Sequence, residues 1–152
     1  MSFPSISFAL VPFHLGKGSN TKLGKRAIIG SHCEIIAKGK IQIGNYFSIN
    51  KYTRIVALEN ITIGDNVTIA QFVSVLDHDH AYKIVDGNML LEGYTTSPIV
   101  IGNNVWIGDK VTICKGVTIG NNVIIGANSV VTKDIENNCI AAGIPCKKLK
   151  EI

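Results

Sequence analysis

Aliphatic residues recur at every sixth position along the C-terminal part of the chain. From residue 101 to 132 the sequence reads IGNNVW, IGDKVT, ICKGVT, IGNNVI, IGANSV, VT, and in most units glycine follows the aliphatic residue. Valine, once Ser129, stands four positions after it. An amphipathic helix repeats its apolar residues at spacings of three and four, so this pattern does not predict a helix. A period of six favours short strands whose first and fifth residues face one interior, with glycine at a corner.

The same six-residue unit fills most of the chain, in five sets of three. The aliphatic markers of these sets are Leu23, Ile29, Ile35; Ile43, Ile49, Ile55; Ile63, Ile69, Val75; Ile101, Ile107, Ile113; and Ile119, Ile125, Val131. The sets start 20, 20, 38 and 18 residues apart, whereas three units make 18. The first two turns therefore carry two extra residues, around 37–40 and 57–60, and the third carries a 20-residue insertion between Leu76 and Pro98. The pattern predicts a three-sided solenoid of parallel strands, with turns stacked about 4.8 Å apart.

Composition narrows the class of protein. The chain of 152 residues is 46% apolar, which suits one domain with an Ile/Val interior, and no apolar run is long enough to predict a membrane span. The net charge of +4, without interleaved aromatics, gives no reason to expect a nucleic-acid partner. Four cysteines without CxxC spacing and a start without a basic segment favour a cytoplasmic protein without a signal peptide. We expect an N-terminal cap over 1–22, the solenoid over 23–136 with an inserted loop at 77–98, and a C-terminal tail over 137–152.

Three segments carry a family resemblance: IGNNVWIG, GVTIGNNVIIGANSVVTKDI and the ending AAGIPCK. They resemble the hexapeptide-repeat acyltransferases, most of all the galactoside and maltose O-acetyltransferases and the enzymes that acetylate capsule or lipopolysaccharide sugars. The resemblance covers roughly Leu23 to Ile152. It implies a left-handed parallel β-helix, acetyl-CoA as donor, a carbohydrate acceptor, and a homotrimer with active sites between neighbouring subunits. The handedness rests on the resemblance alone, since parallel crossovers are usually right-handed.

Two histidines interrupt the repeat in the segment VLDHDHAYK. Extending the six-residue frame from Val75 places Asp79 in the inward fifth position, where an unpaired carboxylate would cost several kcal/mol. We therefore expect the chain to leave the coil here, with His80 outward and His78 near a corner. Imidazole has an ordinary pKa of about 6.5, so its neutral form can take a proton from a sugar hydroxyl that attacks a thioester.

Ungapped superposition on the family's catalytic segment places the base at His80, with His78 as the second candidate. Asp77 or Asp79 would orient the ring at the substrate site. The chain departs from the galactoside type by having DHDH there, without the following His-Pro. Three alternatives stay open: loop-surface histidines without a catalytic role, N-acetyl transfer to an amino sugar or another amine, and a zinc site like that of γ-class carbonic anhydrases. For zinc, only His14 and His32 remain as further ligands, so no metal is expected.

Trp106 is the only tryptophan and falls in the sixth position, between inward Val105 and Ile107. Strand alternation points it outward, which favours an interface or a flat ligand, and the matching family residue lines the acyl-CoA and acceptor site. Asn50 falls on the position of a sugar-binding asparagine in the galactoside group, although asparagine also suits left-handed backbone at solenoid corners. The second polar sugar contact of that group falls on Leu58, which predicts a different acceptor.

The resemblance places donor binding on the C-terminal coils. Backbone amides of Gly108 and Asp109 would face the thioester oxygen, as an oxyanion hole does. Ala127 and Thr132 match positions that the family uses to contact the pantetheine arm. Lys147 and Lys150 replace residues that are often arginines facing the CoA phosphates. Lysine lacks the bidentate fork of arginine, which predicts weaker phosphate binding, unless KKLK is a solvated tail. We expect the loop over 81–97 to project over a neighbouring subunit's site and to select the acceptor.

Overall fold

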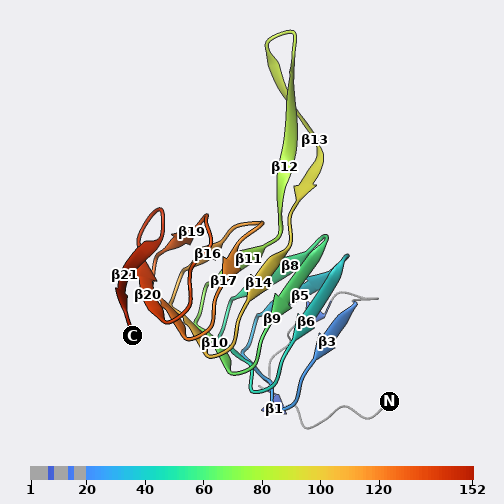
Figure 1. Cartoon of the computed structure of the whole chain (residues 1–152). Helices are drawn as coiled ribbons and strands as arrows, with labels where there is room; N and C mark the ends of the chain where they lie inside the picture. Colours follow the sequence, from blue (N-terminus) through green and yellow to red (C-terminus); the bar gives the residue numbers. More distant parts are fainter. Residues whose placement is uncertain (1–6, 9–13, 16–19) are drawn as a thin grey trace.

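The computed structural model describes residues 7–8, 14–15 and 20–152, with side chains from residue 20 onward. Throughout this part of the chain the regular elements are β-strands, which form three largely parallel sheets around one interior and one separate hairpin (Figure 1). The predicted all-β parallel solenoid is therefore confirmed.

The three sheets are named A, B and C. Sheet A contains β1 (Ser7–Phe8), β4 (Ile28–Ile29), β7 (Ser48–Ile49), β10 (Val67–Ile69), β15 (Val105–Ile107), β18 (Val123–Ile125), β20 (Cys139–Ala142) and β21 (Lys147–Glu151). Sheet B contains β2 (His14–Leu15), β5 (Glu34–Ala37), β8 (Arg54–Ala57), β11 (Ser74–Leu76), β16 (Thr112–Ile113) and β19 (Val130–Val131). Sheet C contains β3 (Thr21–Leu23), β6 (Lys40–Ile43), β9 (Asn60–Ile63), β14 (Ile99–Ile101) and β17 (Thr118–Ile119).

Each turn of the solenoid passes from sheet C to sheet A to sheet B and back to sheet C. It therefore has three corners, which we call C–A, A–B and B–C. Neighbouring turns stay in register, so that Val67, Val105 and Val123 are strand partners in sheet A. Residues at the same place in successive turns consequently lie side by side along the solenoid.

Burial follows the predicted period of six. The aliphatic markers from Ile29 to Val131 are at most 5% exposed, while Leu23 is only partly buried against this core. In the units that carry no extra residues, the fifth positions are buried as well, including two with hydroxyl side chains, Thr53 and Ser129. The Thr53 hydroxyl donates to the Ala70 carbonyl at 2.8 Å, and that of Ser129 donates to the Gly126 carbonyl at 2.6 Å. Both polar groups are thus satisfied inside the coil.

The C–A corner is lined by asparagines. Asn66, Asn104, Asn122 and Asn138 occupy left-handed backbone with φ between 55° and 57°, which asparagine tolerates better than most residues. Their side chains form a ladder from turn to turn, with hydrogen bonds of 3.0, 3.0 and 2.8 Å. This corner therefore keeps one shape along much of the solenoid.

All the extra residues lie at the B–C corner. Two turns have two-residue corners there, at 38–39 and 58–59, as the spacing predicted. In the next turn the chain leaves the coil as β12 (His78–Val85) and returns as β13 (Asn88–Thr96), an antiparallel hairpin that projects from the solenoid (Figure 1). The expected loop is therefore a β-hairpin. Asp86 and Gly87 at its tip have φ angles of 49° and 75°, which suit a tight hairpin turn.

The two ends of the chain extend the same sheets. At the C-terminal end β20 continues sheet A in parallel with β18, and β21 folds back antiparallel to β20. The expected tail over 137–152 thus begins with a strand of the solenoid. At the N-terminal end β1 and β2 pair with β4 and β5, while most of the expected cap over 1–22 lies outside the described residues.

Candidate active site

A buried carboxylate marks the point where the hairpin leaves the solenoid. Asp77 is 0% exposed. Its oxygens accept hydrogen bonds from the backbone amides of Leu58, Glu59 and Asn60 at 2.8, 2.8 and 2.9 Å. As expected, the chain leaves the coil in this segment: the hairpin strand starts at His78, so that Asp77 is buried and Asp79 is exposed. The three N–H donors offset the cost of burying the charge.

Two imidazoles share one face of the hairpin root. Nδ1 of His78 lies 3.1 Å from Oδ1 of Asp77, and the His78 side chain is 16% exposed. His80, two residues further along β12, is exposed, and no described residue hydrogen-bonds its ring. The ring of Tyr94 contacts both, edge-on to His78 at 5.5 Å between centroids and tilted against His80 at 4.7 Å. The root thus holds one oriented histidine and one accessible histidine, joined by a tyrosine.

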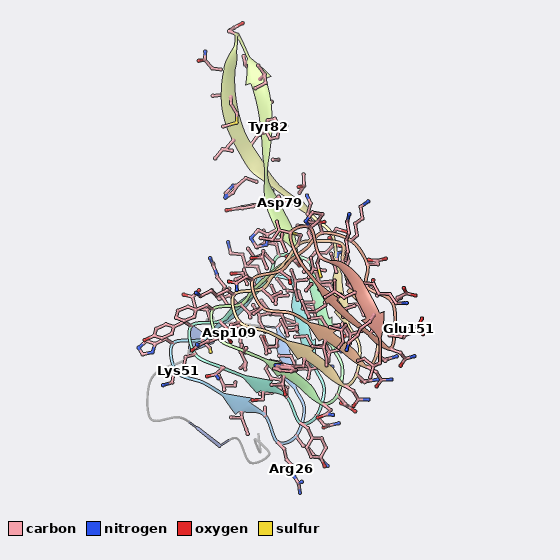
Figure 2. All side chains as sticks on the ribbon, turned by 90° about the vertical axis from the view of Figure 1, so that its left-hand side faces the viewer. Arg26, Lys51, Asp79, Tyr82, Asp109 and Glu151 are labelled. Atoms are coloured by element: carbon pink, nitrogen blue, oxygen red, sulfur yellow. The ribbon has the colours of Figure 1, made fainter. Side chains whose placement is uncertain are left out.

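Asp79 lies on the opposite face of β12, as strand alternation requires. Its carboxylate is 3.3 Å from Nζ of Lys115, which also contacts the Thr95 hydroxyl. Figure 2 shows Asp79 at the base of the hairpin and Tyr82 farther along it. Asp79 therefore pairs with Lys115 and does not contact the histidines through a hydrogen bond.

The half-buried thiol of Cys114 lies at the same corner. Burial, and then the negative charge of Asp79, raise the pKa of the Cys114 thiol. Since the thiolate is the nucleophilic form, this environment disfavours a covalent role for Cys114. The chemistry that the root can offer is proton transfer by imidazole.

A second group of predicted site residues lies at the A–B corner. Gly108 stacks directly on Ala127 of the next turn, since a Cβ at Gly108 would lie 2.7 Å from the Ala127 nitrogen. The Gly108 amide donates to the Ile125 carbonyl at 2.9 Å, so the sheet already uses it. The Asp109 amide has no acceptor among residues 20–152, and its carboxylate accepts from the Gln71 amide at 3.3 Å. Of the two predicted oxyanion donors, only Asp109 has a free N–H in one chain.

Asn50 lies at the same A–B corner, two turns nearer the N-terminus. Its carboxamide oxygen accepts from the Lys51 amide at 2.8 Å. The left-handed residue of this corner is Tyr52, with φ of 58°, and not Asn50. The ring of Tyr52 stacks between His32 and Phe72, with centroids 4.9 and 5.1 Å apart. Left-handed backbone therefore does not explain the asparagine at position 50.

Trp106 points outward from sheet A, as predicted, and is 54% exposed. It lies between its strand partners Thr68 and Ile124. The three residues line an open groove of about 470 Å³, together with Ile152 and three asparagines of the C–A corner, Asn66, Asn104 and Asn122. The groove therefore lies on sheet A beside the C–A corner, and Gly108 follows Trp106 two residues later in the chain.

One chain does not bring all the predicted residues together. Trp106, Gly108, Asp109 and Ala127 lie on sheet A and the A–B corner, whereas the histidines lie at the B–C corner. Figure 2 shows this separation between Asp109 and Asp79. Thr132 follows β19 and is exposed at the B–C corner, two strands beyond β11 in sheet B. Lys147 and Lys150 are exposed on β21, at the outer edge of sheet A.

Sequence reasoning missed Tyr94 and Lys115, which complete the hairpin root. The signal for Tyr94 was the Asp-Gly pair at 86–87 between apolar stretches, which predicts a tight hairpin. Once paired, the strands place Tyr94 directly opposite His80. Lys115 had no such signal, because its contact with Asp79 depends on how the root packs against the next turn.

Among the residues with described side chains, no group of three or more His, Cys, Asp or Glu residues is arranged to hold a metal ion. Of the two further histidines weighed as zinc ligands, His32 stacks on Tyr52 at the A–B corner and His14 has no described side chain. In the described part of the chain, no helix capable of crossing a membrane occurs.

Known proteins resemble this chain in both sequence and fold. Residues 98–133 match the family model "Bacterial transferase hexapeptide (six repeats)". A galactoside O-acetyltransferase from Escherichia coli (strain K12) is 49% identical over 115 residues, which cover 74% of this chain and 54% of that protein. The chain thus spans about half the length of this curated relative.

Solved structures share the solenoid as well. A maltose O-acetyltransferase from Clostridium difficile 630 is 37% identical, with a TM-score of 0.76 over 85% of this chain and 68% of that one. A mutant of AntD, an N-acyltransferase from Bacillus cereus, in complex with dTDP and coenzyme A, is 25% identical, with a TM-score of 0.81 over 91% of this chain and 76% of that one.

Proposed function

This chain belongs to the bacterial hexapeptide-repeat transferases, and from that premise we propose that it transfers an acetyl group from acetyl-CoA to a hydroxyl of a sugar or glycan. The observation that carries the proposal is the pair of histidines at the hairpin root, one held by a buried carboxylate and the other open to solvent. The similarity to galactoside and maltose O-acetyltransferases supports the donor and the acceptor class. Four free cysteines favour the cytoplasm as its location.

The proposed reaction is a direct attack on the thioester. The acceptor hydroxyl oxygen bonds to the carbonyl carbon while a root histidine takes the hydroxyl proton. The Asp109 amide donates to the carbonyl oxygen as it becomes negative. The carbon–sulfur bond then breaks, the CoA sulfur takes the proton from the imidazolium, and the products are an O-acetyl ester and free CoA. Superposition on the family favours His80 as the base, whereas the carboxylate partner favours His78.

For the donor, we propose the C-terminal turns. Ala127 stacks on Gly108 beside Asp109, which leaves a narrow strip with small side chains for the pantetheine arm. Thr132 would contact the same arm from the B–C corner of the neighbouring subunit. Lys147 and Lys150, exposed on β21, would attract the CoA phosphates as point charges. The acceptor would lie nearer the hairpin and Asn50.

The site needs a second copy of the chain. The histidines and Trp106 lie on different sides of the solenoid, so we propose a homotrimer in which the hairpin root of one subunit faces Trp106 of its neighbour. One face of the distal hairpin supports this, because its four apolar side chains, Tyr82, Ile84, Met89 and Leu91, are 62–67% exposed. The other face carries the Lys83–Glu92 ion pair. An isolated two-stranded hairpin is at best marginally stable in water, so a neighbour should cover the apolar face.

Mixing two inactive variants should restore activity. Trp106→Ala lacks the aromatic side of the site and His78→Ala lacks the oriented histidine. When both are co-expressed, about a quarter of the sites in randomly mixed trimers combine an intact histidine with an intact tryptophan from the neighbour, so about a quarter of wild-type kcat should return.

The measurement is turnover of the co-expressed, co-purified protein carrying two different tags, beside a simple mixture of the separately purified variants as the control. A site contained within one chain predicts no recovery, and that outcome would reject the intersubunit arrangement.

The function itself is tested by following thioester consumption with acetyl-CoA across sugars, nucleotide sugars and glycan fragments. Matched acceptors with a hydroxyl or an amine at the same carbon separate O-acetyl from N-acetyl transfer. The second is a real alternative, because a similar structure is an N-acyltransferase with bound coenzyme A. Exclusive use of amine acceptors would replace the proposal with N-acetyl transfer.

A further inference from the structure

The Asp77 carboxylate replaces main chain that is missing at the B–C corner. In the first turn the corner amides of Lys38, Gly39 and Lys40 donate to carbonyls of the following turn. The following corner, at 58–60, has no such neighbour, because the next turn leaves the coil as the hairpin. The two Asp77 oxygens accept these three N–H groups instead. The side chain therefore joins the hairpin root to the solenoid.

The main chain of Asp77 is fixed as well. Its carbonyl accepts from the Ser97 amide at 2.9 Å, which closes the root of the hairpin, and its amide points at the Val56 carbonyl at 3.5 Å. With the side chain fully buried, the carboxylate has very little freedom to move. Any group that hydrogen-bonds to it is held in a defined place.

That group is the imidazole of His78. An ionised carboxylate can only accept hydrogen bonds, so the 3.1 Å contact with Nδ1 requires the proton of the neutral ring to lie on Nδ1. Nε2 is then the free acceptor. The His78 ring packs in a T-shaped contact against the ring of Tyr94. Because 16% of the His78 side chain is exposed, an acceptor hydroxyl can reach it. His80 is also against Tyr94, but no described residue fixes its tautomer.

We infer that Asp77 is a positioning residue that sets the tautomer of His78 and thereby makes His78, rather than His80, the proton acceptor. The inference rests on the proposed acetyl transfer. It assigns one carboxylate two tasks, since the same oxygens anchor the hairpin to the solenoid and orient the base.

The first test needs no substitution and no activity. The ring ¹⁵N shifts of the histidines in the full-length protein, recorded above the imidazole titration range, are expected to show His78 with its proton on Nδ1. Assignment uses the His78→Gln spectrum. A His78 ring protonated on Nε2 would overturn the inference. Because this spectrum contains no substrate, it is independent of whether acetyl transfer is found.

The second test is Asp77→Asn. If the carboxamide oxygen still accepts hydrogen bonds from the amides of Glu59 and Asn60, the NH₂ group faces Nδ1 of His78. It then favours the tautomer that carries the proton on Nε2. We expect the His78 proton to move to Nε2 and kcat to fall about 10- to 100-fold, with the KM for acetyl-CoA little changed. Wild-type kcat in a folded Asp77→Asn protein would contradict the inference. If this variant does not fold, the wild-type spectrum still decides.

Thr53→Val is the matched control. Thr53 is also fully buried and also bridges turns, through the Ala70 carbonyl and the Val73 amide, but it does not contact a histidine. It should lower stability while leaving the His78 tautomer and kcat unchanged. A loss of kcat in Thr53→Val equal to that in Asp77→Asn would mean that general loosening of the solenoid explains both. Thioester consumption that is absent in the wild-type protein, with His78 protonated on Nδ1, would reject the proposed function and leave the Asp77–His78 pairing intact.

Discussion

His78→Ala is expected to lower kcat by about 10²- to 10⁴-fold, the usual contribution of a general base. The KM for acetyl-CoA should change little, because the donor is proposed to bind on the C-terminal turns. His80→Ala should cost less than about tenfold, since His80 would line the acceptor site without taking the proton. Steady-state thioester consumption with the best acceptor from the panel measures both.

The order of the two effects is informative. A large loss in His80→Ala with a small loss in His78→Ala would assign the base to His80, as superposition on the family does, and would overturn the role of Asp77. Unchanged activity in both variants would remove histidine catalysis altogether. CoA binding measured by calorimetry serves as the control for folding, because it should be retained in each.

Phe47→Ala is expected to destabilise the protein by about 3–5 kcal/mol, because it deletes a large fully buried side chain from a core that otherwise consists of aliphatic residues and cysteines in the described part of the chain. The adjacent Tyr46 is 55% exposed, with Arg26 over its ring, and offers a matched control. Tyr46→Ala should cost less than about 1 kcal/mol. Urea unfolding at one fixed protomer concentration measures both, since assembly couples stability to concentration. Similar losses in the two variants would contradict the inward and outward assignment of this turn.

The repeat could be predicted from the sequence because burial dictates it. Each aliphatic marker residue, such as Ile107, must face the interior, because a shift of the strand by one residue would bury Trp106 in its place. The same reasoning located the extra residues at one corner. It also predicted that the chain leaves the coil before Asp79 would be buried, but it did not locate the exact residue at which the chain leaves. Only the hydrogen bonds to Asp77 reveal that point.

The candidate site was predicted less completely, for physical reasons. The histidines stood out because they break an apolar pattern, but their partners come from other turns and from the returning strand. Tyr94 reaches His80 only through the pairing of β12 with β13, and Lys115 reaches Asp79 across a corner. Trp106 was correctly predicted to point outward, yet its distance from the histidines in one chain follows only from the position of the hairpin at the B–C corner.

Every change of turn length is confined to the B–C corner, while the C–A corner keeps its asparagine ladder and the A–B corner keeps its stacked rings. A chain built in this way can exchange the hairpin for a longer, shorter or chemically different excursion without shifting the register of any strand. If the donor binds on the C-terminal turns and the hairpin meets the acceptor, as proposed, the two functions occupy separable parts of the chain. Acceptor preference would then be expected to change through substitutions at the B–C corner alone.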